Sequence, residues 1–254
     1  MEKNTFLNHD KPLLTVMVQA DTPQRIEELV SLGVSRGGEA FGMQFCRMKE
    51  EYRNRETYSH LFSLCDKPIY VTNYRGWYNK EKSDEVIAAE LVELAECGAT
   101  LCDVMGDMFD RQPGEMTYDP VAVDKQKKLI ADIHAAGGEV LMSSHIFNFT
   151  PAEKVLEIAL EQQSRGADIC KIVTGAGSMA EQIENLRIIN LLKEKLDVPF
   201  LFLAGGECTV LRRIGGNLGC CMYLCVAERD EFSTRIQPLL EDVKLIRDLL
   251  LEAK

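Results

Sequence analysis

Residues 150–173 read TPAEKVLEIALEQQSRGADICKIV and contain one complete helix, turn and strand. Thr150-Pro151 suits the N-cap and first turn of a helix, and Gly166 suits a helix C-cap. The apolar run at 167–173 then predicts a strand that is covered on both faces. Such strands belong to parallel sheets whose faces are packed with helices.

The same unit recurs along the whole chain. We predict eight strands, at Leu13–Val18, Phe41–Cys46, Ile69–Asn73, Thr100–Met105, Glu139–Ser143, Asp168–Val173, Phe200–Leu203 and Met222–Val226. Helical patterns lie at Thr22–Arg36, Ser83–Cys97, Asp119–Ala136, Thr150–Arg165, Ser178–Lys195 and Arg235–Glu252. Eight such units in 254 residues are typical of a single (β/α)8 (TIM) barrel domain spanning residues 1–254. The alternative is an open doubly wound sheet, but the glycine-rich dinucleotide fingerprint is missing after the first strand.

Composition narrows the class of protein. Forty acidic residues against 29 basic ones give a net charge of −11, which argues against a nucleic-acid-binding surface. No run of about 18 apolar residues predicts a membrane span, and the N-terminus has no apolar signal-peptide core. Nine cysteines without a CxxC pair suit a reducing compartment. We therefore expect a cytoplasmic protein.

Lys171 lies inside the apolar strand pattern, where a charge is costly. A buried lysine escapes this cost by becoming a neutral amine, which can attack a ketone to form an imine. We expect burial and neighbouring arginines to favour that neutral form. The alternative is a structural lysine that reaches solvent or pairs with an acidic residue.

Polar residues mark the ends of the predicted strands, where barrel enzymes carry their chemistry. They are Gln19, Gln44 to Arg47, Tyr74-Arg75, Asp103 to Asp107, Ser143-Ser144-His145, Lys171, Glu207 and Glu228-Arg229. His145 and Lys171 fall on neighbouring strands at a similar height. A structural histidine is the alternative, but the pair predicts a base beside a nucleophile.

Two segments resemble the type I 3-dehydroquinate dehydratases of the shikimate pathway. Residues 144–151 read SHIFNFTP against the family pattern S-x-H-D-F-x-x-T-P, and residues 166–172 read GADICKI against G-A-D-I-x-K-I. The resemblance implies a barrel whose Lys171 forms an imine with the substrate ketone and whose His145 transfers the proton. It also implies a carbon–oxygen lyase without metal or organic cofactor, acting on a small keto substrate that bears a carboxylate, and a homodimer.

The resemblance further implies substrate-binding residues. An arginine after strand seven corresponds to Arg213, with Arg212 as the alternative, and a third-strand arginine corresponds to Arg75. Ser233 and Gln237 correspond to the serine and glutamine of a closing loop.

The second strand departs from the family. Its E-x-R-x-D pattern is replaced by Gly42, Gln44 and Cys46, and the glutamate that supports the histidine is replaced by Asn79. We expect Gln44 and Asn79 to face the substrate from the pocket wall formed by strands two and three. The pocket beside this wall should be larger and less charged than in the family.

Three functions follow from this mixture of kept and lost residues. The first is dehydration of 3-dehydroquinate to 3-dehydroshikimate, in either aromatic biosynthesis or catabolism. The second is the same imine chemistry, as dehydration or retro-aldol cleavage, on a different keto acid. The third is a barrel that has lost catalysis and serves as a binding protein, against which the kept closing-loop residues argue.

Overall fold

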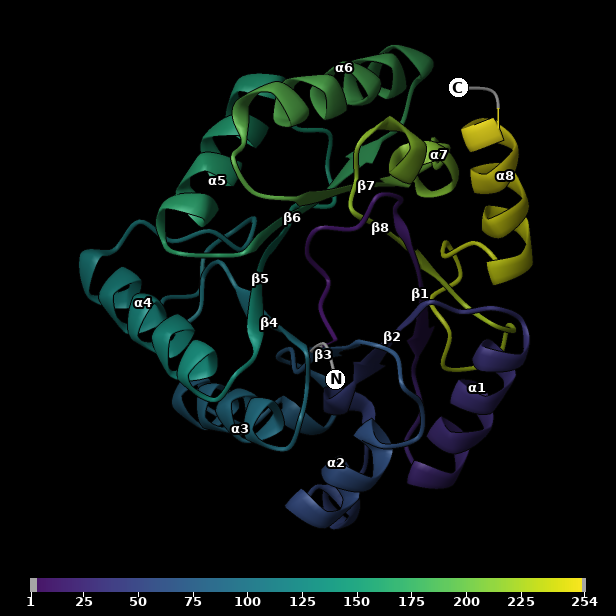
Figure 1. Cartoon of the computed structure of the whole chain (residues 1–254). Helices are drawn as coiled ribbons and strands as arrows, with labels where there is room; N and C mark the ends of the chain where they lie inside the picture. Colours follow the sequence, from purple (N-terminus) through teal and green to yellow (C-terminus); the bar gives the residue numbers. More distant parts are fainter. Residues whose placement is uncertain (1–3, 253–254) are drawn as a thin grey trace.

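Eight parallel strands form a barrel that is surrounded by helices (Figure 1). This computed structural model describes residues 4–252. The predicted (β/α)8 fold is confirmed.

The strands are β1 (Leu13–Val18), β2 (Ala40–Gln44), β3 (Ile69–Thr72), β4 (Leu101–Met105), β5 (Glu139–His145), β6 (Ile169–Ala176), β7 (Phe200–Gly206) and β8 (Met222–Cys225). The helices are α1 (Pro23–Ser35), α2 (Arg55–Phe62), α3 (Asp84–Glu96), α4 (Pro120–Ala135), α5 (Ala152–Ser164), α6 (Met179–Lys195), α7 (Leu211–Leu218) and α8 (Leu240–Glu252).

Each strand pairs with its sequence neighbour, and β8 pairs with β1. At the remaining seam, between β7 and β8, the backbone amide of Cys221 just before β8 donates to the Phe200 carbonyl of β7 at 2.9 Å. The barrel is thus nearly closed. In the β5–β6 ladder Ser143 lies opposite Lys171 and His145 opposite Val173, which sets the relative height of the two predicted catalytic residues.

The N-terminal segment crosses the middle of the ring in Figure 1 and closes the end of the barrel where the strands begin. Its Phe6 side chain is buried and meets the ring of Tyr70 edge-on at 6.4 Å. The Phe6 amide also donates to Glu139, the first residue of β5, at 2.9 Å. A pocket can therefore open at the other end, where the strands finish.

The helices differ from the prediction in their ranges. No range was predicted for α2 or α7, although a helix was expected after every strand, and α8 begins at Leu240 rather than Arg235. α7 contains Gly215 and Gly216, which lower helix propensity. A Cβ on Gly216 would lie 2.3 Å from the Tyr223 ring, so close packing explains that glycine. Tertiary packing therefore overrides the local signal.

Among residues 4–252 no helix is both long and apolar enough to cross a bilayer. All nine cysteines carry free thiols.

Candidate active site

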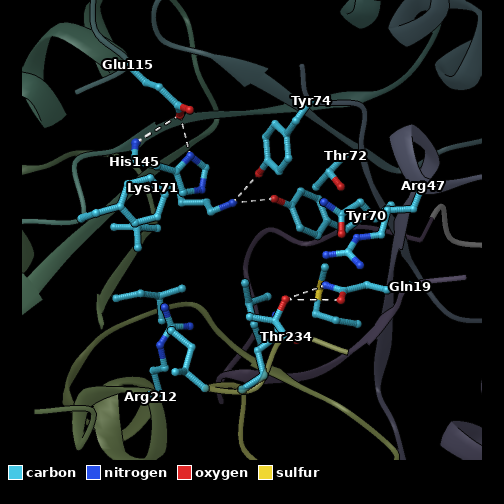
Figure 2. A pocket seen from close by; sticks show the side chains of 18 of the residues that line it. Gln19, Arg47, Tyr70, Thr72, Tyr74, Glu115, His145, Lys171, Arg212 and Thr234 are labelled. Atoms are coloured by element: carbon cyan, nitrogen blue, oxygen red, sulfur yellow. Dashed lines mark hydrogen bonds and ion pairs between the residues drawn. The ribbon is translucent and has the colours of Figure 1, made fainter. Parts of the chain in front are cut away.

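A cavity of about 400 Å³ opens at the carboxyl ends of the strands. Lys171 from β6 and His145 from β5 both line it, and Figure 2 shows their side chains next to each other. The two residues predicted as nucleophile and base are therefore brought together by adjacent strands.

Lys171 is buried at this site, with three hydrogen-bond partners. Its Nζ atom donates to the Tyr74 hydroxyl at 2.7 Å, the Tyr70 hydroxyl at 3.1 Å and the Asp103 carboxylate at 3.0 Å. The expectation of neighbouring arginines is wrong, because the charged neighbour is an acid. The resting lysine is held as an ion pair, as the structural alternative supposed, yet it faces the cavity.

Burial and charge act in opposite directions on this cluster. Burial raises the pKa of Tyr70 and Tyr74 well above its ordinary value, and the adjacent Asp103 charge adds to this. Burial alone would raise the pKa of Asp103 too, but Lys171 and hydrogen bonds from Ser143 and the tyrosines outweigh it. The pKa of Asp103 is therefore lowered, and both phenols stay protonated beside a carboxylate.

His145 is held by an acid that was not predicted from the sequence. Its Nδ1 atom lies 2.6 Å from Glu115, and its backbone amide donates to the same oxygen at 3.2 Å. An ionised carboxylate only accepts, so Nδ1 carries a hydrogen and Nε2 is the nitrogen left for the pocket. Glu115 lies in the β4–α4 loop at a positive φ of 49°, after Gly114, and nothing in that local sequence marks it.

Arg212, not Arg213, lines the cavity. Its Nε atom donates to the Ala204 carbonyl at 2.8 Å, and in the described part of the chain it forms no ion pair. Burial lowers the pKa of Arg212 to about 10. Arg213 instead contacts Thr209 at 3.4 Å and does not line the cavity. The phase of α7 turns Arg212 inward, so the alternative position is the one that the fold selects.

Arg47 is a second cation at the cavity. β2 ends at Gln44, and a 3-10 turn at Phe45–Arg47 breaks the strand alternation, so that Arg47 lines the site and Cys46 is buried. The Arg47 guanidinium stacks on Trp77 at 4.2 Å and donates to the Phe232 carbonyl at 2.9 Å. Figure 2 shows it across the pocket from His145.

Several buried polar atoms around the cavity have no hydrogen-bond partner among the described residues. They are Gln44 Oε1, Arg47 Nε, Thr72 Oγ1 and Gln237 Oε1. Unpaired buried polar groups are costly, and a polar ligand would satisfy them. The predicted residues Gln44 and Gln237 thus lie at the cavity.

Ser233, which was predicted as a closing-loop residue, does not line the main cavity. Its hydroxyl donates to the Asp230 carbonyl at 2.9 Å and stabilises a turn. The next residue, Thr234, faces the cavity and accepts a hydrogen bond from Gln19 at 3.1 Å (Figure 2). The loop residue that faces the cavity is therefore Thr234, one position after the predicted Ser233.

Arg75 and Asn79 have structural partners. Arg75 borders the cavity, but its guanidinium forms ion pairs with Asp84 at 2.6 Å and Asp107 at 2.7 Å. The buried Asn79 donates to Asn73 at 2.8 Å and accepts from Arg53 at 2.6 Å, outside the cavity. Asn79 therefore does not face the site, because its loop folds away from it.

The expected enlargement of the wall is wrong at Gly42. A Cβ there would lie 2.3 Å from Met17 Sδ and 3.1 Å from Tyr70 Cδ1. These two side chains occupy the space that a side chain at residue 42 would need. Met17 and Tyr70 therefore fill this part of the pocket wall, and Arg47 adds a positive charge to the cavity lining.

Comparison with known proteins points to one family. The family model described as type I 3-dehydroquinase matches residues 52–233. The 3-dehydroquinate dehydratase of Lactiplantibacillus plantarum is 26% identical over 154 residues, which are 57% of this chain and 60% of the relative. The chain thus aligns with less than two thirds of the length of that curated relative.

Solved structures share the fold over nearly the full length. A type I 3-dehydroquinate dehydratase from Clostridium difficile with covalently modified comenic acid superposes with a TM-score of 0.82 at 17% identity, covering 97% of this chain and 95% of that one. The 3-dehydroquinate dehydratase of Geobacillus kaustophilus gives a TM-score of 0.83 at 14% identity, covering 98% and 96%. At these identities the likeness concerns the fold.

Proposed function

Because the chain belongs to the type I 3-dehydroquinase family, we propose that it dehydrates 3-dehydroquinate to 3-dehydroshikimate through an imine on Lys171. The observation that carries this proposal is the buried Lys171 amine, which faces the same cavity as the His145–Glu115 pair. A nucleophile and a base on adjacent strands, both facing one cavity, are what imine-based elimination requires.

The geometry supports a role for each residue. The Lys171 imine would draw electrons from the adjacent carbon and so acidify its C–H bond. Nε2 of His145 would take that proton and return it to the departing hydroxyl, so that water is lost overall. Glu115 would hold the imidazole in the required tautomer.

Arg212 supports binding of the substrate carboxylate. It is a buried cation without an acidic partner among the described residues, and its two terminal nitrogens are the fork that a carboxylate fits. Gln44, Thr72 and Arg47 would contact the substrate hydroxyls, because each has an unpaired polar atom at the cavity. They would replace the charges that the second strand has lost.

A cytoplasmic homodimer remains our prediction from the sequence. Single (β/α)8 organisation of the entire chain also remains a proposal.

The decisive experiment is covalent trapping. We expect borohydride with 3-dehydroquinate to give a reduced adduct on the Lys171 peptide by mass spectrometry, and Lys171→Ala to give none. His145→Ala should still form the adduct but lose turnover by roughly 10²- to 10⁴-fold. Equal labelling of the parent and Lys171→Ala would place the nucleophile elsewhere. Absence of any adduct and of product would refute the proposed activity.

A further inference from the structure

Imine formation requires that two protons leave Nζ of Lys171. In the structure that nitrogen has three hydrogen-bond acceptors, which match the three hydrogens of an ammonium group. A fully hydrogen-bonded ammonium has no lone pair with which to attack a ketone. Some neighbouring group must therefore accept and return these protons.

His145 is not in direct contact with that nitrogen. Its Nδ1 atom is held by Glu115, and among the described residues it has no hydrogen bond to Lys171 or Asp103. The groups that do touch Nζ are Asp103, Tyr70 and Tyr74. Asp103 is fully buried and accepts from both tyrosines and, at 2.6 Å, from Ser143.

We propose that Tyr74 and Asp103 form the proton relay that makes and breaks the imine at Lys171, a role that rests on the proposed function. Asp103 takes one proton from the ammonium, and the freed nitrogen attacks the carbonyl carbon. A C–N bond forms while the carbonyl oxygen takes the Tyr74 hydroxyl proton.

The remaining steps balance within the same groups. The nitrogen of the carbinolamine returns a proton to the Tyr74 phenolate, and the C–O bond then breaks as the hydroxyl takes the Asp103 proton through Tyr74. Ammonium and ketone thus become iminium and water without an outside proton. The 2.5 Å contact between Tyr74 and Asp103 gives a direct path for that last transfer.

Tyr74 suits the relay better than Tyr70. Its hydroxyl is nearer to Nζ, at 2.7 Å against 3.1 Å, and its ring meets the His145 ring edge-on at 5.3 Å (Figure 2). Tyr74 therefore contacts both the nucleophile and the base, next to the carbon that the amine attacks. Tyr70 is fully buried against Phe6 and acts as a positioning residue for Asp103.

The matched pair Tyr74→Phe and Tyr70→Phe tests this assignment, since each removes one hydroxyl from the same two partners. Adduct formation with 3-dehydroquinate is followed by rapid borohydride quench and mass spectrometry. We expect Tyr74→Phe to slow adduct formation about 100-fold or more and Tyr70→Phe less than about tenfold. His145→Ala should form adduct at the parent rate while product formation falls by roughly 10²- to 10⁴-fold.

Adduct formation by Tyr74→Phe at the parent rate would overturn the relay, and so would equal slowing by both variants. A parent protein that forms no adduct would instead refute the proposed function. If Tyr74→Phe does not fold, 3,5-difluorotyrosine at residue 74 keeps the ring and lowers the phenol pKa. The relay requires the adduct rate to change with that acidity, and an unchanged rate contradicts it.

Discussion

Arg212 and Arg213 are adjacent on α7 but meet different surroundings. The buried Arg212 lines the cavity and donates to one backbone carbonyl, whereas the half-buried Arg213 donates to the Thr209 side chain and does not line the cavity. A charge-assisted pair with a carboxylate is worth more when water is excluded from it. The side chain that binds the substrate carboxylate should therefore be Arg212.

We expect Arg212→Gln to raise the KM for 3-dehydroquinate by roughly 10- to 100-fold, because a charged hydrogen bond contributes about 1.5–3 kcal/mol. Arg213→Gln is the matched control and should change KM less than twofold. Steady-state kinetics on both variants measures the difference. The reverse ranking would return the carboxylate site to Arg213.

At the scale of elements, Arg75 ties three segments together. It follows β3, pairs with Asp84 at the start of α3, and pairs with Asp107 after β4. The Asp84 carboxylate also accepts from the Phe109 amide at 2.7 Å. These contacts fasten the β3 and β4 loops to each other beside the cavity.

We expect Arg75→Gln to destabilise the fold by about 3 kcal/mol, because it leaves two largely buried carboxylates without their cation. Its KM should stay near the parent value under conditions where the variant is folded. Thermal and denaturant unfolding measure the first effect and steady-state kinetics the second. An unaltered stability together with a large increase in KM would instead support the role that the family resemblance implies.

For the whole molecule, acid stability depends on paired carboxylates. Burial would raise the pKa of these groups, but cation partners outweigh it and lower the pKa of Glu39 beside Arg247, Asp84 beside Arg75 and Asp103 beside Lys171. Asp107 acts in the opposite direction, because burial raises its pKa. The three lowered groups set the net direction.

A carboxyl whose pKa is lower in the folded state contributes stability above its unfolded pKa of about 4, and loses it as pH falls through the folded value. We therefore expect the melting temperature to fall steadily below about pH 4.5. Asp103→Asn should make the melting temperature depend less on acidic pH, although it also leaves Lys171 without an ionic partner. Calorimetry between pH 7 and pH 3 measures the melting temperature of both proteins, and a constant parent value over this range would contradict the expectation.

The architecture and the central pair of residues were predictable from the sequence. Glycine caps, apolar runs and helix periodicity are local signals, and repetition of one unit along the chain predicts the barrel. A lysine within one apolar strand and a histidine at the end of the strand before it must then share a rim. Lys171 and His145 could thus be selected without coordinates.

Their partners were decided only by the tertiary structure. Asp103 and Tyr74 reach Lys171 across the barrel interior, and Glu115 reaches His145 from a loop 30 residues away. The turn after β2 directs Arg47, and the phase of α7 directs Arg212. Such contacts depend on loop paths and on helix and turn geometry, where a shift of one residue exchanges buried and exposed positions. Local sequence carries no signal for that choice, because packing between distant segments makes it.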